Sequence, residues 1–164
     1  LQVLDFIPEG DWPLLSLGNI DWVYVAAPRY LEHSARLVGF SDLNQQRLLL
    51  AEHQQQGIYM RQADALLRWQ PENAHIFTEL NTVLDAVKQG MGVAFLPYTL
   101  VHQAILAGDV LRVLDPLVIP GSAVFCMSNP VLEQSDIMLP LLREKLLAYF
   151  RAQQKSAAAW LGRT

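Results

Sequence analysis

The sequence has few charged residues and only one cysteine. The charged share is 17%, where about 25% is usual for globular proteins. Cys126 lies in the apolar run AVFCM, so no disulfide can form within the chain, and a small buried side chain is a better interpretation than a nucleophile or redox thiol. A chain without disulfides fits a reducing compartment, and we expect the protein to be cytoplasmic.

Long hydrophobic runs and secretion signals are also missing. No run of about 18 uncharged apolar residues is present, so we expect no membrane span. The formal net charge is −4, and the Lys and Arg residues are scattered among acids, which leaves no basic stripe to follow a phosphate backbone. We therefore expect these residues not to contact DNA. The chain opens at Leu1 in a strand-like run, and we expect it to be a piece of a longer protein.

Motifs for catalysis, metal binding and nucleotide binding are absent as well. The four histidines show neither H-x3-H spacing nor pairing with cysteine, so no metal site is expected. No G-x-S-x-G elbow, P-loop or G-x-G-x-x-G occurs, and the GMG at 90–92 follows a predicted helix and precedes a predicted strand, the reverse of a dinucleotide fingerprint. We expect a protein that is not an enzyme and binds no cofactor.

The sequence is instead rich in short apolar segments, and hydrophobic residues make up 52% of it. Short continuous apolar runs are typical of strands covered on both faces, and they predict strands at 1–7, 21–27, 47–52, 75–80, 92–96, 110–114 and 123–128. Apolar residues at helical spacing predict helices over 59–69, 82–89 and 97–107, and a longer one opened by Ser135 or Asp136 with Pro140 in its first turns. This alternation predicts an α/β fold with a mostly parallel, doubly wound sheet.

Capping and glycine residues support the middle of this pattern. Asn81 or Thr82 is expected to cap the helix predicted at 82–89. Gly90 is expected to end it in a left-handed conformation, which a side chain would disfavour. Gly92 is expected to let the following strand pass close to its neighbour.

Two stretches of the chain resemble a known family. Residues 83–114, VLDAVKQGMGVAFLPYTLVHQAILAGDVLRVL, run from a helix through Gly-x-Gly to a strand closed by Leu-Pro, then a helix, a Gly-Asp turn and a strand. Residues 23–50, VYVAAPRYLEHSARLVGFSDLNQQRLLL, carry a second set of motifs. In this order and at this spacing they resemble the effector-binding half of LysR-type transcriptional regulators, and the resemblance covers nearly the whole chain.

The resemblance implies two α/β lobes of periplasmic-binding-protein type, joined by two crossing strands. Residues 1–27 would supply the remainder of the first lobe and the first crossover strand, residues 28–121 the second lobe, and residues 122–164 the return crossover strand and the C-terminal helix of the first lobe. The first lobe would be incomplete, because the family has further N-terminal strands and helices, a linker helix and a winged helix-turn-helix. A small-molecule effector is expected in the cleft between the lobes.

Three short segments supply the candidate effector-binding residues. The loop HQQQG follows the strand predicted at 47–52, and its amides and imidazole can donate to and accept from a polar metabolite. The start of the helix predicted at 82–89 offers N–H groups to an anion, although simple capping explains it equally well. The turn FIPEG ends the opening strand. For it and for HQQQG the alternative is a plain solvated turn. The candidates are His53, Gln54, Gln55, Gln56, Asn81, Thr82, Ile7, Pro8 and Glu9.

The resemblance also implies partners. A homodimer or homotetramer is expected, with DNA bound only through a helix-turn-helix domain outside this chain. The helix predicted at 59–69, with Leu66, Leu67 and Trp69, and the strand predicted at 21–27 are candidates for the partner face. Two rivals stay open at this point: a periplasmic-type solute-binding protein of the same lobe architecture, and an α/β enzyme or lyase of binding-protein fold.

Overall fold

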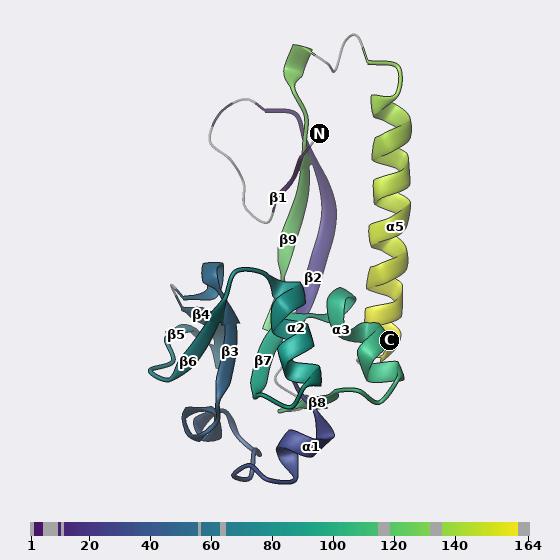
Figure 1. Cartoon of the computed structure of the whole chain (residues 1–164). Helices are drawn as coiled ribbons and strands as arrows, with labels where there is room; N and C mark the ends of the chain where they lie inside the picture. Colours follow the sequence, from purple (N-terminus) through teal and green to yellow (C-terminus); the bar gives the residue numbers. More distant parts are fainter. Residues whose placement is uncertain are drawn as a thin grey trace. The chain divides into compact units, whose positions relative to one another are not determined.

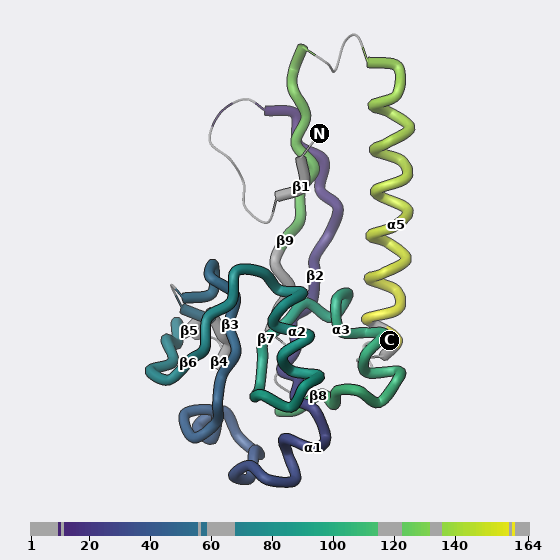
Figure 2. The backbone as a smooth tube through the Cα atoms, viewed as in Figure 1, coloured from purple at the N-terminus to yellow at the C-terminus, as the bar shows by residue number. Residues whose placement is uncertain are grey.

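A computed structural model describes residues 2–4, 10, 12–55, 57–62, 65–114, 119–131 and 136–160 (Figure 1, Figure 2). The chain divides into two compact units: unit 1 comprises Leu1–Asp21 and Gly121–Thr164, and unit 2 comprises Trp22–Pro120. It passes from one unit to the other within two strands, β2 (Leu14–Ala26) and β9 (Ile119–Met127). The predicted lobe boundaries after residues 27 and 121 stay predictions.

Unit 2 is built on a mixed sheet with parallel central strands. Besides the end of β2 it contains β3 (Leu48–Ala51), β6 (Ala74–Phe77), β7 (Val93–Pro97) and β8 (Leu111–Val113). β3 pairs in parallel with β6 on one side and with β7 on the other. β2 pairs antiparallel with β7, from Trp22 opposite Pro97 to Ala26 opposite Val93, and also antiparallel with β8. Within unit 2 the described strands therefore follow the order β2-β7-β3-β6, with β8 beside β2 off this path.

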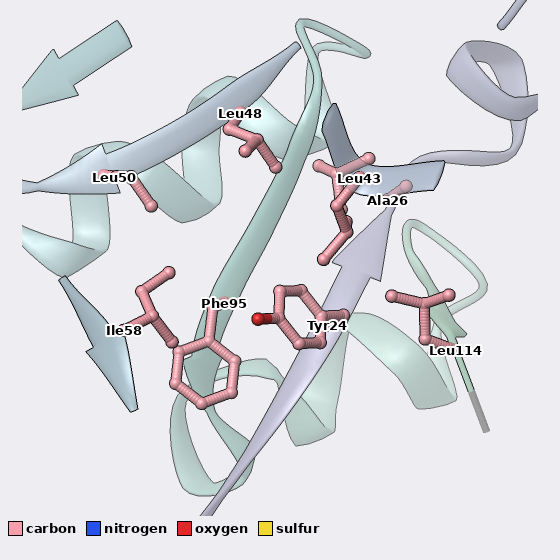
Figure 3. Close-up of a cluster of buried hydrophobic side chains, with 9 residues drawn as sticks. Tyr24, Ala26, Leu43, Leu48, Leu50, Ile58, Phe95 and Leu114 are labelled. Carbon is pink, nitrogen blue, oxygen red and sulfur yellow. The ribbon is translucent and has the colours of Figure 1, made fainter. Parts of the chain in front are cut away.

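Both faces of this sheet are buried at β3, β7 and the end of β2, which explains the continuous apolar runs of these strands in the sequence. One face carries a cluster that includes Tyr24 of β2, Leu50 of β3 and Phe95 of β7 (Figure 3). Alternate residues of the same strands, such as Leu49 and Leu96, are buried outside that cluster. Two helices, α2 (Leu80–Lys88) and α3 (Tyr98–Leu106), contact β7, and α2 also contacts β3. The remaining short helices of unit 2 are α1 (Pro28–Leu31), η1 (Phe40–Gln45) and η2 (Glu52–Gln54).

The helix predicted at 59–69 is wrong. The structure has an antiparallel pair there, β4 (Ile58–Gln62) and β5 (Ala65–Trp69), with Ile58 opposite Trp69. The predicted window spans two strands and their connection, so its helical spacing arose from residues of different strands. Each strand also contains apolar residues two positions apart, such as Ile58 and Met60 in β4 and Leu67 and Trp69 in β5, which is the spacing of a strand. The prediction of a partner face along a helix at 59–69 is withdrawn with it.

The start of α2 also differs from the prediction, whereas its end is confirmed. The N-cap is Glu79, which makes no side-chain capping bond, and Asn81 and Thr82 lie inside the first turn, so neither caps the helix. Gly90 has φ +68° just after the helix, as predicted. A Cβ atom on Gly92 would overlap the carbonyl of Arg47, which confirms the close approach of β7 to β3.

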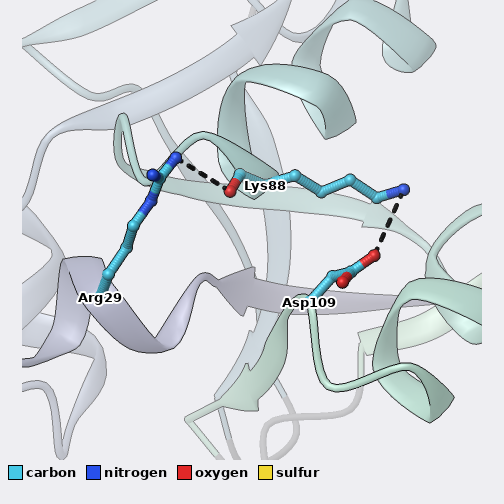
Figure 4. Close-up of polar contacts among 3 residues, drawn as sticks. All are labelled: Arg29, Lys88 and Asp109. Atoms are coloured by element: carbon cyan, nitrogen blue, oxygen red, sulfur yellow. Dashed lines mark hydrogen bonds and ion pairs between the residues drawn. The ribbon is translucent and has the colours of Figure 1, made fainter.

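Polar contacts join the carboxyl end of α2 to α1 on one side and to the turn after α3 on the other (Figure 4). The Arg29 guanidinium donates to the Lys88 carbonyl at 3.1 Å and to Oε1 of Gln89 at 3.2 Å. Lys88 Nζ lies 3.7 Å from Oδ2 of Asp109, which follows α3. Because a helix end leaves carbonyl groups without intrahelical donors, Arg29 satisfies one of those groups. The exposed ion pair adds little to stability.

Unit 1 pairs strands with one long helix. β1 (Gln2–Leu4) is antiparallel to β9, with Gln2 opposite Met127, and α5 spans Leu139–Trp160. Its core holds Leu17, Val124 and Cys126, packed against side chains of α5 that include Leu146, Leu147 and Phe150. Cys126 is fully buried and forms no disulfide, in agreement with the sequence interpretation.

Side-chain hydrogen bonds fasten α5 to the strands of unit 1. Nε2 of Gln154 donates to the Leu17 carbonyl at 3.3 Å and to the Asn19 carbonyl at 3.2 Å, and Arg143 donates to Oγ of Ser128 at 2.7 Å. Asp136 precedes the helix and accepts the N–H of Met138 at 2.8 Å. Pro140 is the second residue of α5, as predicted, and Ser135 lies outside the described residues.

Candidate functional site

The loop after β3 is fixed by one buried glutamine. Gln54, the last residue of η2, donates from Nε2 to the Phe95 carbonyl of β7 at 2.8 Å. Its Oε1 accepts the N–H of Ala51 at 2.9 Å. The side chain is only 6% exposed, so both bonds form away from water and hold η2 across the carboxyl ends of β3 and β7. Gln54 therefore positions the loop and does not present its amide to solvent.

His53 and Gln55 flank Gln54 and are both exposed. The His53 ring lies edge-on to the indole of Trp22, with 6.4 Å between ring centroids, and Trp22 stacks on Phe95 at 5.2 Å. Within the part of the chain that the structure describes, the Trp22 indole N–H is buried and has no hydrogen-bond partner. The exposed imidazole of His53 therefore packs against the Trp22 ring of β2, which in turn packs against Phe95 of β7.

Asn81 and Thr82 belong to the same edge of the sheet. α2 follows β6, and the last residue of β6, Phe77, is in register with Ala51, the last residue of β3. The loop at 53–55 and the first turn of α2 therefore follow neighbouring parallel strands at their carboxyl ends. Both side chains are exposed, and the first turn of any helix leaves N–H groups without intrahelical acceptors. The edge offers an imidazole, an amide and backbone donors.

Other predicted site residues cannot be placed. Gln56, Ile7, Pro8 and Glu9 lie outside the described residues. Trp22, which lies beside His53, was not among the predicted site residues, because its run was interpreted as a strand and a candidate partner face. Its position opposite Pro97, at the end of the strand that the Leu-Pro motif closes, depends on a strand pairing that the sequence does not show.

A metal centre or a membrane helix finds no support in the residues that can be described. Over the described ranges, no group of three or more His, Cys, Asp or Glu side chains is arranged to hold a metal ion. None of the helices described has the length and apolar character needed to cross a bilayer.

A family model described as the LysR substrate binding domain matches residues 5–148. The chain belongs to this family. A comparison with curated proteins found no match. The family is one of regulatory, effector-binding domains and not a class of enzymes.

Solved structures with a similar fold include the regulatory domains of LysR-type regulators. The full-length virulence activator AphB of Vibrio cholerae is 18% identical with a TM-score of 0.65, over 91% of this chain and 49% of that chain. The regulatory domain of CrgA from Neisseria meningitidis is 12% identical with a TM-score of 0.72, over 90% of this chain and 74% of that one. The effector domain of AmpR from Pseudomonas aeruginosa is 19% identical with a TM-score of 0.70, over 89% of this chain and 69% of that one.

This LysR substrate-binding domain therefore spans about half the length of full-length AphB. The likenesses and the family match confirm the predicted α/β fold of periplasmic-binding-protein type. At sequence identities this low, the solved structures support the fold alone.

Proposed function

We propose that this chain is the effector-binding region of a LysR-type transcriptional regulator and that a small metabolite binds beside η2 and the first turn of α2. The observation that carries the proposal is the fixed loop: Gln54 holds η2 in place and leaves His53 and Gln55 exposed beside the start of α2. Ligands of open α/β sheets bind beyond the carboxyl ends of the strands, which is where both segments lie.

The chemistry of this edge favours an effector with a carboxylate or a similar acceptor. The N–H groups of the first turn of α2 and the amide of Gln55 can donate to an anion, and the positive end of the helix dipole adds to the attraction. His53 can donate or accept according to its tautomer. The indole of Trp22, beside His53, would provide an apolar wall. Gln56, Ile7, Pro8 and Glu9 remain proposed as further contacts of the effector.

The regulatory setting is part of the same proposal. Effector occupancy would shift a conformational equilibrium by no more than its differential affinity for the two states. DNA would be bound by a helix-turn-helix domain outside these residues, in a homodimer or homotetramer in the cytoplasm. The family match supports this setting over a solute-binding protein or an enzyme.

Calorimetry with a panel of small carboxylates tests the site. Acetate, succinate, benzoate and phenylacetate vary in size and in aromatic character. For whichever of them binds, we expect His53→Ala and Gln55→Ala each to weaken binding about tenfold or more, because a hydrogen bond to a charged group contributes about 1.5–3 kcal/mol.

Gln103→Ala is the matched control, since Gln103 is an exposed glutamine on α3, a different helix. It should leave affinity unchanged. If the two loop variants bind as tightly as the parent chain, the loop does not contact the effector and the proposed site is wrong.

A further inference from the structure

We propose that unit 2 carries a second ligand site, the Trp69 pocket, which takes a small uncharged molecule with several hydroxyl groups, of the sugar or polyol class. The pocket has a volume of about 450 Å³, within the range of small-molecule sites. It lies in the hollow between η1, the start of β3, the end of β5 and the segment that leads into β6. It is lined by Leu43, Asn44, Gln46, Leu48, Trp69, Gln70, Pro71, Glu72 and Asn73.

The pocket is separate from the proposed effector site. Leu48 is the first residue of β3, and Asn73 immediately precedes β6. The pocket therefore opens beside the amino ends of these parallel strands, whereas His53 and Gln55 follow their carboxyl ends. A ligand in one site does not occupy the other.

The floor of the pocket is held rigidly by Gln46, which is 2% exposed. Its Oε1 accepts the hydroxyl of Tyr30 at 3.2 Å, and its Nε2 donates to the Ala35 carbonyl at 3.0 Å. The Tyr30 oxygen in turn accepts the N–H of Arg47 at 3.0 Å. A buried glutamine fixed in this way keeps its remaining N–H and lone pair in a defined direction, as a binding site requires.

The walls are held as well. The indole N–H of Trp69 donates to Oδ1 of Asn44 at 3.2 Å, and the Trp69 ring packs edge-to-face on Phe40, with 4.9 Å between centroids. η1, which carries Asn44, begins at a turn closed by Asp42, whose Oδ2 accepts the N–H groups of Val38 and Gly39 at 2.9 Å each. These two hydrogen bonds hold the pKa of the Asp42 carboxyl below its ordinary value.

The lining chemistry selects the ligand class. Among the residues that the structure describes, the Asn44 amide nitrogen, the Glu72 carboxylate and the Asn73 amide have no hydrogen-bond partner. The lining includes no Lys, Arg or His, and Glu72 would repel an anion. Amides both donate and accept, and a carboxylate only accepts, a combination that hydroxyl groups satisfy in full. An ammonium ion would leave the amide N–H groups unused, whereas the C–H face of a sugar can pack on the Trp69 ring.

Titration of the ¹⁵N-labelled chain followed by NMR tests the proposal. The probes are glucose, N-acetylglucosamine, ribose and myo-inositol, with choline as a cation and citrate as an anion. We expect at least one neutral probe to shift the side-chain amide signals of Asn44, Gln46, Gln70 and Asn73 and the indole N–H signal of Trp69. The side-chain amide of Gln103 on α3 should not move.

Variants of exposed lining residues connect the signals to the pocket without disturbing the fold. Asn73→Ala and Glu72→Gln should each weaken the binding of that probe about tenfold, and Gln103→Ala should not. No shift from any neutral probe at about 10 mM, roughly ten times a millimolar Kd, would overturn the proposal. Binding of choline or citrate alone would overturn the assigned ligand class. Neither result bears on binding at His53 and Gln55.

Discussion

Gln54 shows how the burial of one side chain changes the role of its residue. The sequence suggested three equivalent glutamines around a ligand, but only the structure separates Gln54, whose amide binds the backbone of Ala51 and Phe95, from the exposed Gln55. Nothing in the letters HQQQG distinguishes them, because the distinction depends on the neighbouring strand β7. The loop could be predicted from the sequence, but the different roles of Gln54 and Gln55 within it could not.

Replacing Gln54 should therefore affect folding first. We expect Gln54→Ala to lower the free energy of unfolding by about 1–3 kcal/mol, because it leaves a buried N–H and a buried carbonyl without partners. Urea denaturation followed by circular dichroism measures this change. Gln55→Ala, one residue away and exposed, should keep the parent midpoint. Equal midpoints for both variants would refute the anchoring role of Gln54.

Tyr24 is a residue whose hydroxyl costs stability. It is 2% exposed, its ring packs against Phe95 with 4.8 Å between centroids, and over the described part of the chain its hydroxyl has no partner. We expect Tyr24→Phe to raise the free energy of unfolding by about 1 kcal/mol, since it removes a buried unsatisfied group while keeping the ring. Urea denaturation at neutral pH measures the gain, and a loss of stability would contradict the assignment.

The stability gained by Tyr24→Phe should depend on pH. Burial raises the pKa of the Tyr24 hydroxyl above its ordinary value. A group with a raised folded pKa contributes stability below its unfolded pKa of about 10 and loses that contribution as pH rises beyond it. The advantage of Tyr24→Phe should therefore grow between neutral pH and about pH 11. Tyr149→Phe, an exposed tyrosine on α5, is the control and should show no such growth.

At the scale of elements, local signals were sufficient where a single residue decides the backbone. Gly90 ends α2 at positive φ, and its conformation follows from the absence of a side chain. The hairpin of β4 and β5 could not be found in the same way, since its identity depends on pairing between two strands. Likewise, α2 begins two residues before the predicted start. The prediction placed the start too late because it took the polar residues Asn81 and Thr82 for caps. Sequence signals for caps identify the residue type and not its position in the turn.

The pairing of β7 with β3 depends on a second glycine. A Cβ at Gly92 would overlap backbone atoms of Arg47, so the strands would have to separate. We expect Gly92→Ala to lower the free energy of unfolding by about 1–3 kcal/mol, the range for overpacking in a tight core. Gly39→Ala is the control, because Gly39 has φ −123° and an added Cβ would lie 3.9 Å from its nearest neighbour. Thermal unfolding should separate the two variants, and similar transitions would contradict this packing argument.

At the scale of the whole molecule, family motifs carried the prediction further than periodicity could. The order of Gly-x-Gly, Leu-Pro and Gly-Asp around α2, β7 and α3 predicted the fold that the family match confirms. The Trp69 pocket was not predicted, because its lining comes from two stretches, 43–48 and 69–73, that only the folded chain brings together. A site of that kind leaves no spacing in the sequence.

The two units differ in how much apolar surface they bury, and this difference should be visible in amide hydrogen exchange. In unit 2, β3 and β7 are buried on both faces. In unit 1 the described core is small, and α5 keeps apolar side chains exposed, including Leu141, Leu142 and Tyr149. Because local opening is governed by buried contacts, we expect the amides of β3, β7 and α2 to exchange most slowly and those of α5 measurably faster. Exchange measured by mass spectrometry or NMR at neutral pH tests this. Equal protection in α5 and β7 would mean that the chain opens as one cooperative unit and that exposure on α5 does not weaken unit 1.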